Sequence, residues 1–116
     1  MSHPVPIEVE LVEAAGELRV AWSDGHRSRF ALAYLRGWCP CAKCQGHFAE
    51  AKVFVASKGV RLNHLEAVGG YGMKPHWSDG HTTGILSFDY LREIEVAPPG
   101  EGPTNAELLA AGPSAG

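Results

Sequence analysis

Alternating apolar and polar residues dominate the first part of the chain and predict a β-hairpin. Apolar side chains occupy every second position in residues 7–11 and again in residues 18–22, with the break AAGE between the two runs. A strand that buries one face shows this period of two. The pair Asp24 and Gly25 then suits a tight turn, so a third strand is expected in RSRFAL.

Two further strands and two short helices are expected from similar patterns. The strands are residues 60–67 and 71–77, and the helices are residues 31–38 and 88–94. Gly69 and Gly70 join the two strands, and Ser87 is placed as the N-cap of the second helix. Residues 45–58 fit a loose helix or a short strand equally well.

The five letters WSDGH occur twice, at residues 22–26 and 77–81. They open two longer matching stretches, WSDGHRSRFALAYLR and WSDGHTTGILSFDYLR, the second with one extra residue. Each stretch reads as strand, turn, strand and helix, and two such units can bury their helices against a shared sheet. The sequence therefore predicts an α+β fold with a small, mostly antiparallel sheet, short helices and an internal duplication.

The length of 116 residues suits one domain, which we expect at residues 1–97. Residues 98–116 contain Pro, Gly and small side chains with little to bury. We expect this segment to form a flexible tail, with a helical turn at residues 106–111.

Charge and hydropathy narrow the classes of partner. The net charge is -3, and no run of five Lys or Arg residues appears, so nucleic-acid binding is not expected. No apolar stretch approaches the roughly 18 residues that span a bilayer, and the start of the chain lacks a signal-peptide pattern. We therefore expect a cytoplasmic protein that does not bind membranes.

All three cysteines lie in the short segment CPCAKC, as Cys39, Cys41 and Cys44. A secreted disulfide scaffold does not cluster an odd number of cysteines in this way. Pro40 favours an extended chain, in which Cys39 and Cys41 point the same way, and the next two residues allow a turn that returns Cys44. Three idle thiols are the alternative, but the spacing favours a metal such as zinc, which needs a fourth ligand.

Histidines are the candidates for that fourth ligand. His47 follows Cys44 with two residues between them, so it offers a local site without a long loop to close. His26 and His81 each end one copy of WSDGH. Spacing alone slightly favours His47. Three other histidines have no spacing that recommends them, and we expect exposed or hydrogen-bonded imidazoles at His3, His64 and His76.

The combined motifs resemble the gamma-butyrobetaine hydroxylase-like N-terminal domain. They are the two WSDGH words, the pair LR before the cysteines, C-x-C-x2-C, and the G-x-Y that precedes the second word, over about residues 7–96. In the hydroxylase itself, this domain precedes an oxygenase domain and binds zinc. The resemblance implies four zinc ligands, which are Cys39, Cys41, Cys44 and His81. It leaves His26 to support its own turn.

Three residue pairs match between the two repeats: Trp22 and Trp77, Asp24 and Asp79, Arg36 and Arg92. We expect the tryptophans to lie in the core. The aspartates suit turn chemistry better than general-base catalysis, although Asp79 could also orient a ligand histidine. The arginines are expected to bond carbonyls at helix ends or a carboxylate of the other repeat.

Hydroxylase activity does not follow from the resemblance, because in the hydroxylase a facial triad on a much larger β fold carries that chemistry. We expect a non-enzymatic metal-binding module, with zinc, that serves protein interaction or assembly. The alternative is an accessory role in iron–sulfur cluster handling, with iron or a cluster on the same cysteines, since similar domains occur fused to cluster-carrying ATPases. A third possibility is an enzyme with an open zinc position.

Overall fold

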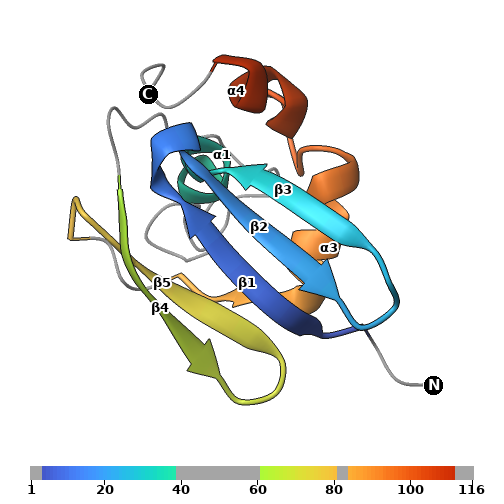
Figure 1. The fold of residues 1–116 in the computed structure, drawn as a ribbon. Helices are drawn as coiled ribbons and strands as arrows, with labels where there is room; N and C mark the ends of the chain where they lie inside the picture. Colours follow the sequence, from blue (N-terminus) through green and yellow to red (C-terminus); the bar gives the residue numbers. More distant parts are fainter. Residues whose placement is uncertain (1–3, 39–60, 81–83, 112–116) are drawn as a thin grey trace, which may run out of the picture.

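The strands form two small antiparallel sheets, each with a short helix packed beside it (Figure 1). The structure is a computed structural model, and it describes residues 4–38, 61–80 and 84–111. The first unit contains β1 (Pro6–Val12), η1 (Glu13–Ala15), β2 (Glu17–Trp22), β3 (Arg27–Ala31) and α1 (Leu32–Gly37). The second unit contains β4 (Leu62–Val68), β5 (Gly72–Trp77), β6 (Leu86–Ser87) and α3 (Phe88–Val96). One further helix, α4 (Asn105–Ala111), follows.

The two sheets repeat the same layout, with strand orders β1-β2-β3 and β4-β5-β6. Pro6 pairs with Trp22 in the first sheet, as Leu62 pairs with Trp77 in the second, and both ladders shift register immediately after these pairs. The α+β class and the antiparallel pairing are confirmed, and the layout agrees with a duplication. The expectation of one shared sheet is wrong, because the described strands form a separate sheet in each unit.

The WSDG turns are alike in their backbone hydrogen bonds. The N–H of Gly25 donates to the carbonyl of Trp22 at 3.0 Å, and the N–H of Gly80 donates to that of Trp77 at 3.0 Å. The two glycines have φ of 87° and 85°, a conformation that a residue with a Cβ rarely adopts. The predicted Asp-Gly turns are therefore confirmed as far as residue 80 in the second unit.

The serine of each turn ties the turn to the start of its own sheet. The hydroxyl oxygen of Ser23 accepts a hydrogen bond from the N–H of Val5 at 3.0 Å. The hydroxyl oxygen of Ser78 accepts one from the N–H of Arg61 at 2.9 Å. Both serines also donate their own backbone N–H to the carbonyl of the same partner at 2.8 Å. Each turn thus positions the first strand of its unit.

The first residue of α1 and that of α3 each donate a hydrogen bond to the connection between the first two strands of their own unit. The N–H of Leu32 donates to the carbonyl of Gly16 at 2.9 Å, and the N–H of Phe88 donates to that of Tyr71 at 2.8 Å. The predicted N-cap Ser87 is confirmed, since its hydroxyl oxygen accepts from the N–H of the third helical residue at 3.0 Å. The start of α3 is therefore fixed by a local cap as well as by its sheet, whereas α1 has the sheet contact without a side-chain cap.

The core lies between the two sheets and the unit helices, and it includes both repeated tryptophans. Trp22 is 1% exposed and Trp77 is 3% exposed, which confirms their predicted place. The largest fully buried side chains are Trp22, Trp38, Tyr34, Phe30, Leu18, Leu35, Leu86, Leu91 and Ile94. Complete burial of one such aliphatic or aromatic side chain contributes about 1.5–3 kcal/mol.

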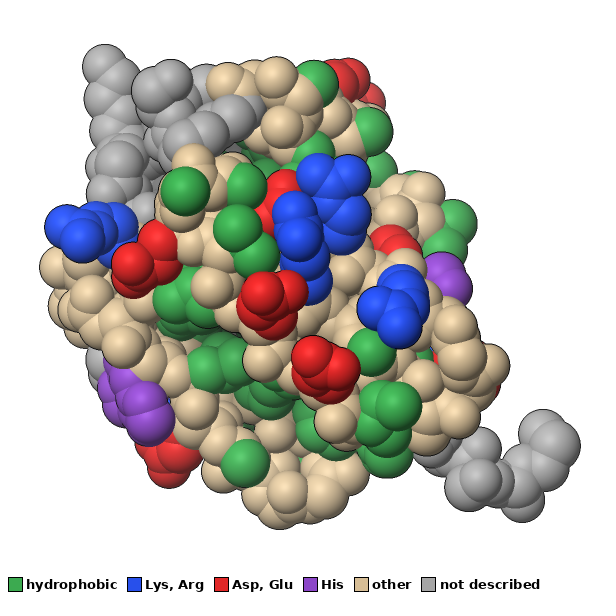
Figure 2. All heavy atoms as spheres, viewed as in Figure 1, with side chains coloured by type: hydrophobic (Ala, Val, Ile, Leu, Met, Phe, Trp, Pro, Cys, Tyr) green, Lys and Arg blue, Asp and Glu red, His purple; other side chains and the backbone are tan. Residues whose placement is uncertain are grey.

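The apolar face of β1 is only partly covered. Val9 pairs with Val20 and Leu11 pairs with Leu18, so these residues share the inner side of the sheet. A hollow of about 390 Å³ separates them from β4, lined by Val9, Leu11, Leu18, Leu62, Asn63, His64 and Leu65. Figure 2 shows apolar side chains in the recess between the two sheets. Of the apolar face predicted for residues 7–11, Val9 and Leu11 border this hollow, whereas Ile7 is 70% exposed.

Helix α4 packs against the free edge of β3 through Asn105, which is 9% exposed. The side-chain amide of Asn105 donates to the carbonyl of Arg29 at 2.6 Å and accepts from the N–H of Ala31 at 3.0 Å. It thus occupies backbone groups that a fourth strand would have used. Leu108 and Leu109 pack against the core.

The expected helical turn at residues 106–111 is present in α4, and the segment buries more than its composition suggested. The boundary between a domain at residues 1–97 and a flexible tail at 98–116 stays a prediction. Residues 45–58, expected as helix or strand, lie outside the described residues. Among the helices in the described ranges, none is long and apolar enough to cross a membrane.

Candidate functional site

The predicted metal ligands lie outside the residues that the structure describes. This applies to the set Cys39, Cys41, Cys44 and His81, and also to the alternative ligand His47. Within the described ranges, no group of three His, Cys, Asp or Glu side chains is arranged to hold a metal ion. The described residues do include the immediate neighbours of the ligands, and these neighbours join the two units.

Two tyrosines exchange hydrogen bonds between the units. The hydroxyl of Tyr34 donates to the carbonyl of Ile94 at 2.6 Å, and the hydroxyl of Tyr90 donates to the carbonyl of Trp38 at 2.5 Å. Each accepting carbonyl lies four residues after the tyrosine of its own unit, so the exchange is reciprocal. Burial raises the pKa of Tyr34 to about 12, which keeps its hydroxyl protonated as a donor.

Two arginine–aspartate pairs repeat the same exchange. Nε of Arg36 lies 2.9 Å from Oδ2 of Asp79, and Nη1 of Arg92 lies 3.1 Å from Oδ2 of Asp24. The expectation that these arginines bond a carboxylate of the other repeat is confirmed. The guanidinium of Arg92 also lies 5.0 Å from the ring centre of Trp22.

Asp24 combines its ion pair with turn chemistry. Its Oδ1 accepts a hydrogen bond from the N–H of His26 at 3.2 Å, as expected for an aspartate in a tight turn. Partial burial raises the pKa of Asp24, but the hydrogen bonds from His26 and Arg92 outweigh this effect, so the pKa lies below its ordinary value. Asp24 is therefore ionised at neutral pH, which suits an ion pair rather than a general base.

The side chain of His26 reaches across to the other unit instead of serving only its own turn. Its Nε2 lies 2.9 Å from both carboxylate oxygens of Glu95. The hydroxyl of Ser28 donates to Glu95 at 2.7 Å, and the indole N–H of Trp22 donates to Ser28 at 2.7 Å. Ser28 bonds the carboxylate of Glu95 and not the imidazole of His26. This series of hydrogen bonds therefore lacks the Ser–His contact that activates a nucleophile.

These contacts form two matching groups. We call Asp24, His26, Tyr34, Arg92, Ile94 and Glu95 the first interface cluster. The second interface cluster has the described members Arg36, Trp38, Asp79 and Tyr90. The contacts that join one unit to the other span sequence separations from 43 to 69 residues.

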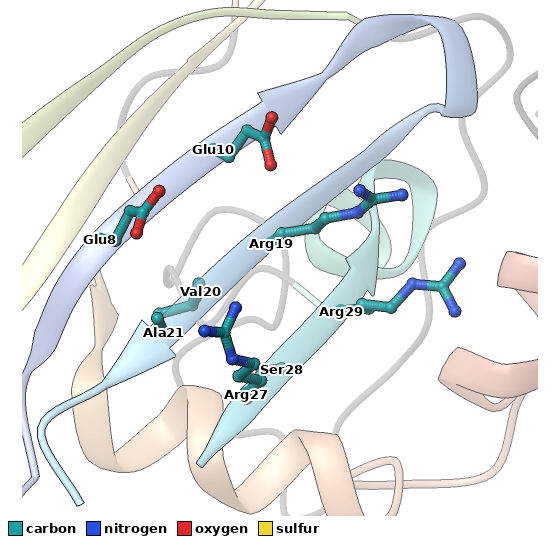
Figure 3. Close-up of a pocket in the computed structure, with 8 residues that line it drawn as sticks. All are labelled: Glu8, Glu10, Arg19, Val20, Ala21, Arg27, Ser28 and Arg29. Atoms are coloured by element: carbon teal, nitrogen blue, oxygen red, sulfur yellow. The ribbon is translucent and has the colours of Figure 1, made fainter. Parts of the chain in front are cut away.

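A separate hollow of about 520 Å³ lies on the outer face of the first sheet. Figure 3 shows that β1 supplies Glu8 and Glu10 on one side, while β2 and β3 supply Arg19, Arg27 and Arg29 on the other. On this face of the molecule, basic and acidic side chains are interspersed (Figure 2). The hollow thus combines both signs of charge and is not a uniformly cationic site.

The buried carboxylate of Glu17 occupies two of those arginines. Nε and Nη2 of Arg29 donate to Glu17 at 2.9 Å each, and Nε of Arg19 donates at 2.7 Å. The hydrogen bond from Arg29 is the main cause that lowers the pKa of Glu17 to about 2, with burial opposing it and Arg19 adding to it. We therefore regard this group as an internal ion-pair cluster of the first sheet.

His64 and His76 were expected to be exposed or hydrogen-bonded imidazoles, and the structure confirms this. Nε2 of His76 lies 3.0 Å from Oε1 of Glu66, and this hydrogen bond is the main cause that lowers the pKa of Glu66. The ring centres of His64 and His76 are 5.4 Å apart on paired strands. His3 lies outside the described residues.

Comparison with known proteins identifies the family. The family model described as gamma-butyrobetaine hydroxylase-like, N-terminal, matches residues 9–92. The chain belongs to the gamma-butyrobetaine hydroxylase-like N-terminal domain family. This confirms the resemblance of the repeated motifs. None of the curated proteins matches the chain.

Solved structures similar to this family member show the same fold. One is the crystal structure of a protein of unknown function of the DUF971 family from Acidithiobacillus ferrooxidans, with 33% identity and a TM-score of 0.64, covering 78% of this chain and 91% of that one. An NMR structure has 25% identity, a TM-score of 0.69 and coverage of 81% and 70%. A second NMR structure has 27% identity, a TM-score of 0.62 and coverage of 84% and 77%.

Sequence reasoning missed Ser28 and Glu95 in this family member. A signal for Glu95 was present in the repeat, because Glu95 follows Tyr90 by five residues, as Cys39 follows Tyr34 by five residues. The alignment of the two stretches ended at the shared Tyr, Leu and Arg, three residues before these positions. The correspondence between Glu95 and Cys39 therefore lies just outside the part of the repeat in which the two sequences match.

Proposed function

We propose that this chain is a non-enzymatic module that holds one zinc ion through Cys39, Cys41, Cys44 and His81 and serves protein interaction or assembly. Three thiolates and one imidazole form a donor set typical of structural zinc sites. Four protein ligands leave no open position for water or substrate, so the ion has a structural role.

The contact between His26 and Glu95 is the observation that carries this proposal. In the repeat, His26 corresponds to His81, and Glu95 corresponds to Cys39. Because the described contacts between the units are reciprocal, the pair corresponding to His26 and Glu95 is His81 and Cys39. This correspondence supports a site that takes its histidine from the second unit and its cysteines from the segment after the first.

The correspondence also separates the two candidate histidines. His26 makes a hydrogen bond with Glu95, whose carboxylate is a hard oxygen donor. No cysteine lies near Glu95 in the sequence. His81 corresponds to it on the side of the chain where three thiolates follow Trp38. A borderline-soft ion such as zinc prefers the side with thiolates.

A metal at this place contributes to the stability of the domain. Structural zinc sites contribute roughly 10 kcal/mol of apparent binding free energy at neutral pH. The ligands would join the end of α1 to the turn after β5, parallel to the Arg36–Asp79 contact. In the hydroxylase the domain precedes an oxygenase domain, and on that analogy we propose a protein partner for the surface that the metal stabilises.

The experiment that tests the proposal is metal content per chain with an absorbance spectrum, on untagged protein purified without air. We expect one zinc per chain and no visible colour in the wild type. His81→Ala should lose the metal, whereas His47→Ala and His26→Ala should keep it. Metal retained in His81→Ala would rule out His81 as a ligand.

Two other results would replace the proposal. Iron with sulfide and visible absorption would favour the handling of an iron–sulfur cluster by the same cysteines. X-ray absorption that counts three protein ligands and one water on zinc would favour an enzyme with an open metal position.

A further inference from the structure

We infer that Tyr90 and the Arg36–Asp79 pair are positioning residues for the metal ligands, a role that their counterparts Tyr34 and Arg92–Asp24 do not share. The inference rests on the proposed metal site. The second interface cluster would then tune metal affinity. The first interface cluster, which uses the same residue types, would contribute to stability alone.

Tyr90 acts on the residue directly before the first cysteine. Trp38 is fully buried, and its N–H donates to the carbonyl of Tyr34 at 3.1 Å within its own unit. Its carbonyl accepts the hydrogen bond from Tyr90 of the other unit at 2.5 Å. Both backbone groups of Trp38, the last described residue before Cys39, are thus held.

The Arg36–Asp79 pair links the segments that lead into both kinds of ligand. Arg36 lies in α1, three residues before Cys39, and Asp79 lies in the turn two residues before His81. The side chain of Arg36 is 11% exposed and that of Asp79 is 39% exposed, so their 2.9 Å contact is covered on the arginine side and open to solvent on the aspartate side. This ion pair therefore joins the two described segments that precede the proposed ligands.

Fixed ligand segments bind a metal more tightly because less conformational freedom is lost when the ion enters. Groups that orient ligands from outside the coordination shell typically change metal affinity by about 10–100-fold. The first interface cluster makes the same kinds of contact beside Glu95, where no cysteine follows. Loss of a contact there removes a link between the units without freeing a ligand segment.

The first test compares Tyr90→Phe with Tyr34→Phe, both as the full chain under reducing conditions. Zinc dissociation constants come from competition with a chromogenic chelator, and melting temperatures come from the zinc-loaded proteins. We expect Tyr90→Phe to weaken zinc binding about tenfold and Tyr34→Phe less than about twofold. Both variants should melt below the wild type, because each loses a hydrogen bond between the units.

A spectroscopic measurement separates positioning from a general loss of stability. Cobalt(II) bound by thiolates in a tetrahedral site has visible d–d bands whose positions and intensities report ligand geometry. We expect these bands to change in Tyr90→Phe and to match the wild type in Tyr34→Phe. Unchanged bands and affinity in Tyr90→Phe would overturn the inference.

The second test uses a double-mutant cycle, which works even where Tyr90→Phe does not fold. Arg36→Gln and Asp79→Asn should each weaken zinc binding about tenfold, and the double variant no more than either single variant. The matched cycle Arg92→Gln with Asp24→Asn should leave affinity within about twofold of the wild type. Equal losses in both cycles would overturn the inference.

Failure of the inference differs from failure of the proposed function. If the wild type takes up no metal, or if His81→Ala keeps its metal, the metal site itself is wrong and the inference is overturned with it. If the wild type binds zinc through His81 and both interface clusters affect affinity equally, only the positioning role is wrong.

Discussion

The two interface clusters use the same framework but end in different chemistry. In both clusters a tyrosine hydroxyl bonds a carbonyl of the other unit, and an arginine pairs with the aspartate of the other turn. Five residues after the tyrosine, one unit has Glu95 and the other has Cys39. The first cluster is completed by the hydrogen bond between His26 and Glu95, and we propose that the second is completed by a metal. On this proposal, the repeated framework supports two chemistries because different residues follow the shared tyrosine and arginine in the two units.

The sheets of the two units differ more than the contacts between them. Glu17 and Gly72 occupy matching positions, since Glu17 pairs with Ala31 and Gly72 pairs with Ser87 at the start of each unit helix. One position holds a buried carboxylate with two arginines, and the other admits no side chain. The contacts between the units are therefore more alike in the two halves than these two matching sheet positions are.

Truncation of the repeated tryptophans gives the largest effect and tests whether they are equivalent. Each of Trp22→Ala and Trp77→Ala should reduce the free energy of unfolding by about 3–5 kcal/mol, because each leaves a cavity in the core. The loss should be larger for Trp22, whose indole bonds Ser28 and lies beneath Arg92. Urea denaturation of both variants checks this order. Equal losses would mean that these additional contacts contribute nothing.

Acid should destabilise the first unit through Glu17. The pKa of Glu17 lies at about 2 in the folded chain against an ordinary value of 4.5, so the folded state favours its ionised form. The resulting stability, about 3 kcal/mol, is present above pH 4.5 and is lost as the pH falls toward 2. The measurement is the difference in unfolding free energy between wild type and Glu17→Gln across this range. A constant difference would contradict the prediction.

A small side chain at the matching position of the second unit should be destabilising. A Cβ at Gly72 would lie 2.9 Å from the carbonyl oxygen of Leu86, a backbone atom that cannot turn away. Gly72→Ala should therefore reduce the free energy of unfolding by about 1–3 kcal/mol. Gly70→Ala is the control, because nothing lies within 4 Å of its Cβ. Thermal melts in which the two variants match would refute the close approach.

The smallest expected effect concerns the helix starts. Ser87 caps α3 with its side chain, whereas Ala31 at the start of α1 provides no such bond. Ser87→Ala should cost about 1 kcal/mol. Ser87→Asn, which keeps a capping oxygen, should recover a large part of the loss. A loss in Ser87→Asn as large as in Ser87→Ala would show that the cap is not the cause.

The first hairpin, the two turns and the start of α3 were predictable because short segments determine them. Alternation predicted the first hairpin, the Asp-Gly pairs predicted the two turns, and Ser87 predicted the start of α3. These features depend on backbone conformation and on residues within a few positions of each other. The family resemblance also came from short sequence motifs of this kind.

The contacts between the units were harder to predict. The link between His26 and Glu95 spans 69 residues, and Asn105 bonds β3 across 74 and 76 residues. The sequence shows no periodicity that pairs such distant positions, and the separation into two sheets likewise depends on tertiary packing. The metal ligands could be named from motifs, and they stay a prediction because they lie outside the described residues.

The reciprocal exchange between the units has a consequence for the order of folding. Each hairpin closes a short loop, which takes microseconds, whereas the bonds from Tyr34 and Tyr90 close over 60 and 52 residues. Neither tyrosine finds its acceptor until the other unit is present, so these bonds raise the contact order of the whole domain, and we expect docking to be slower than hairpin formation. If docking limits the folding rate, mutations in the interface clusters should slow refolding as well as speed unfolding.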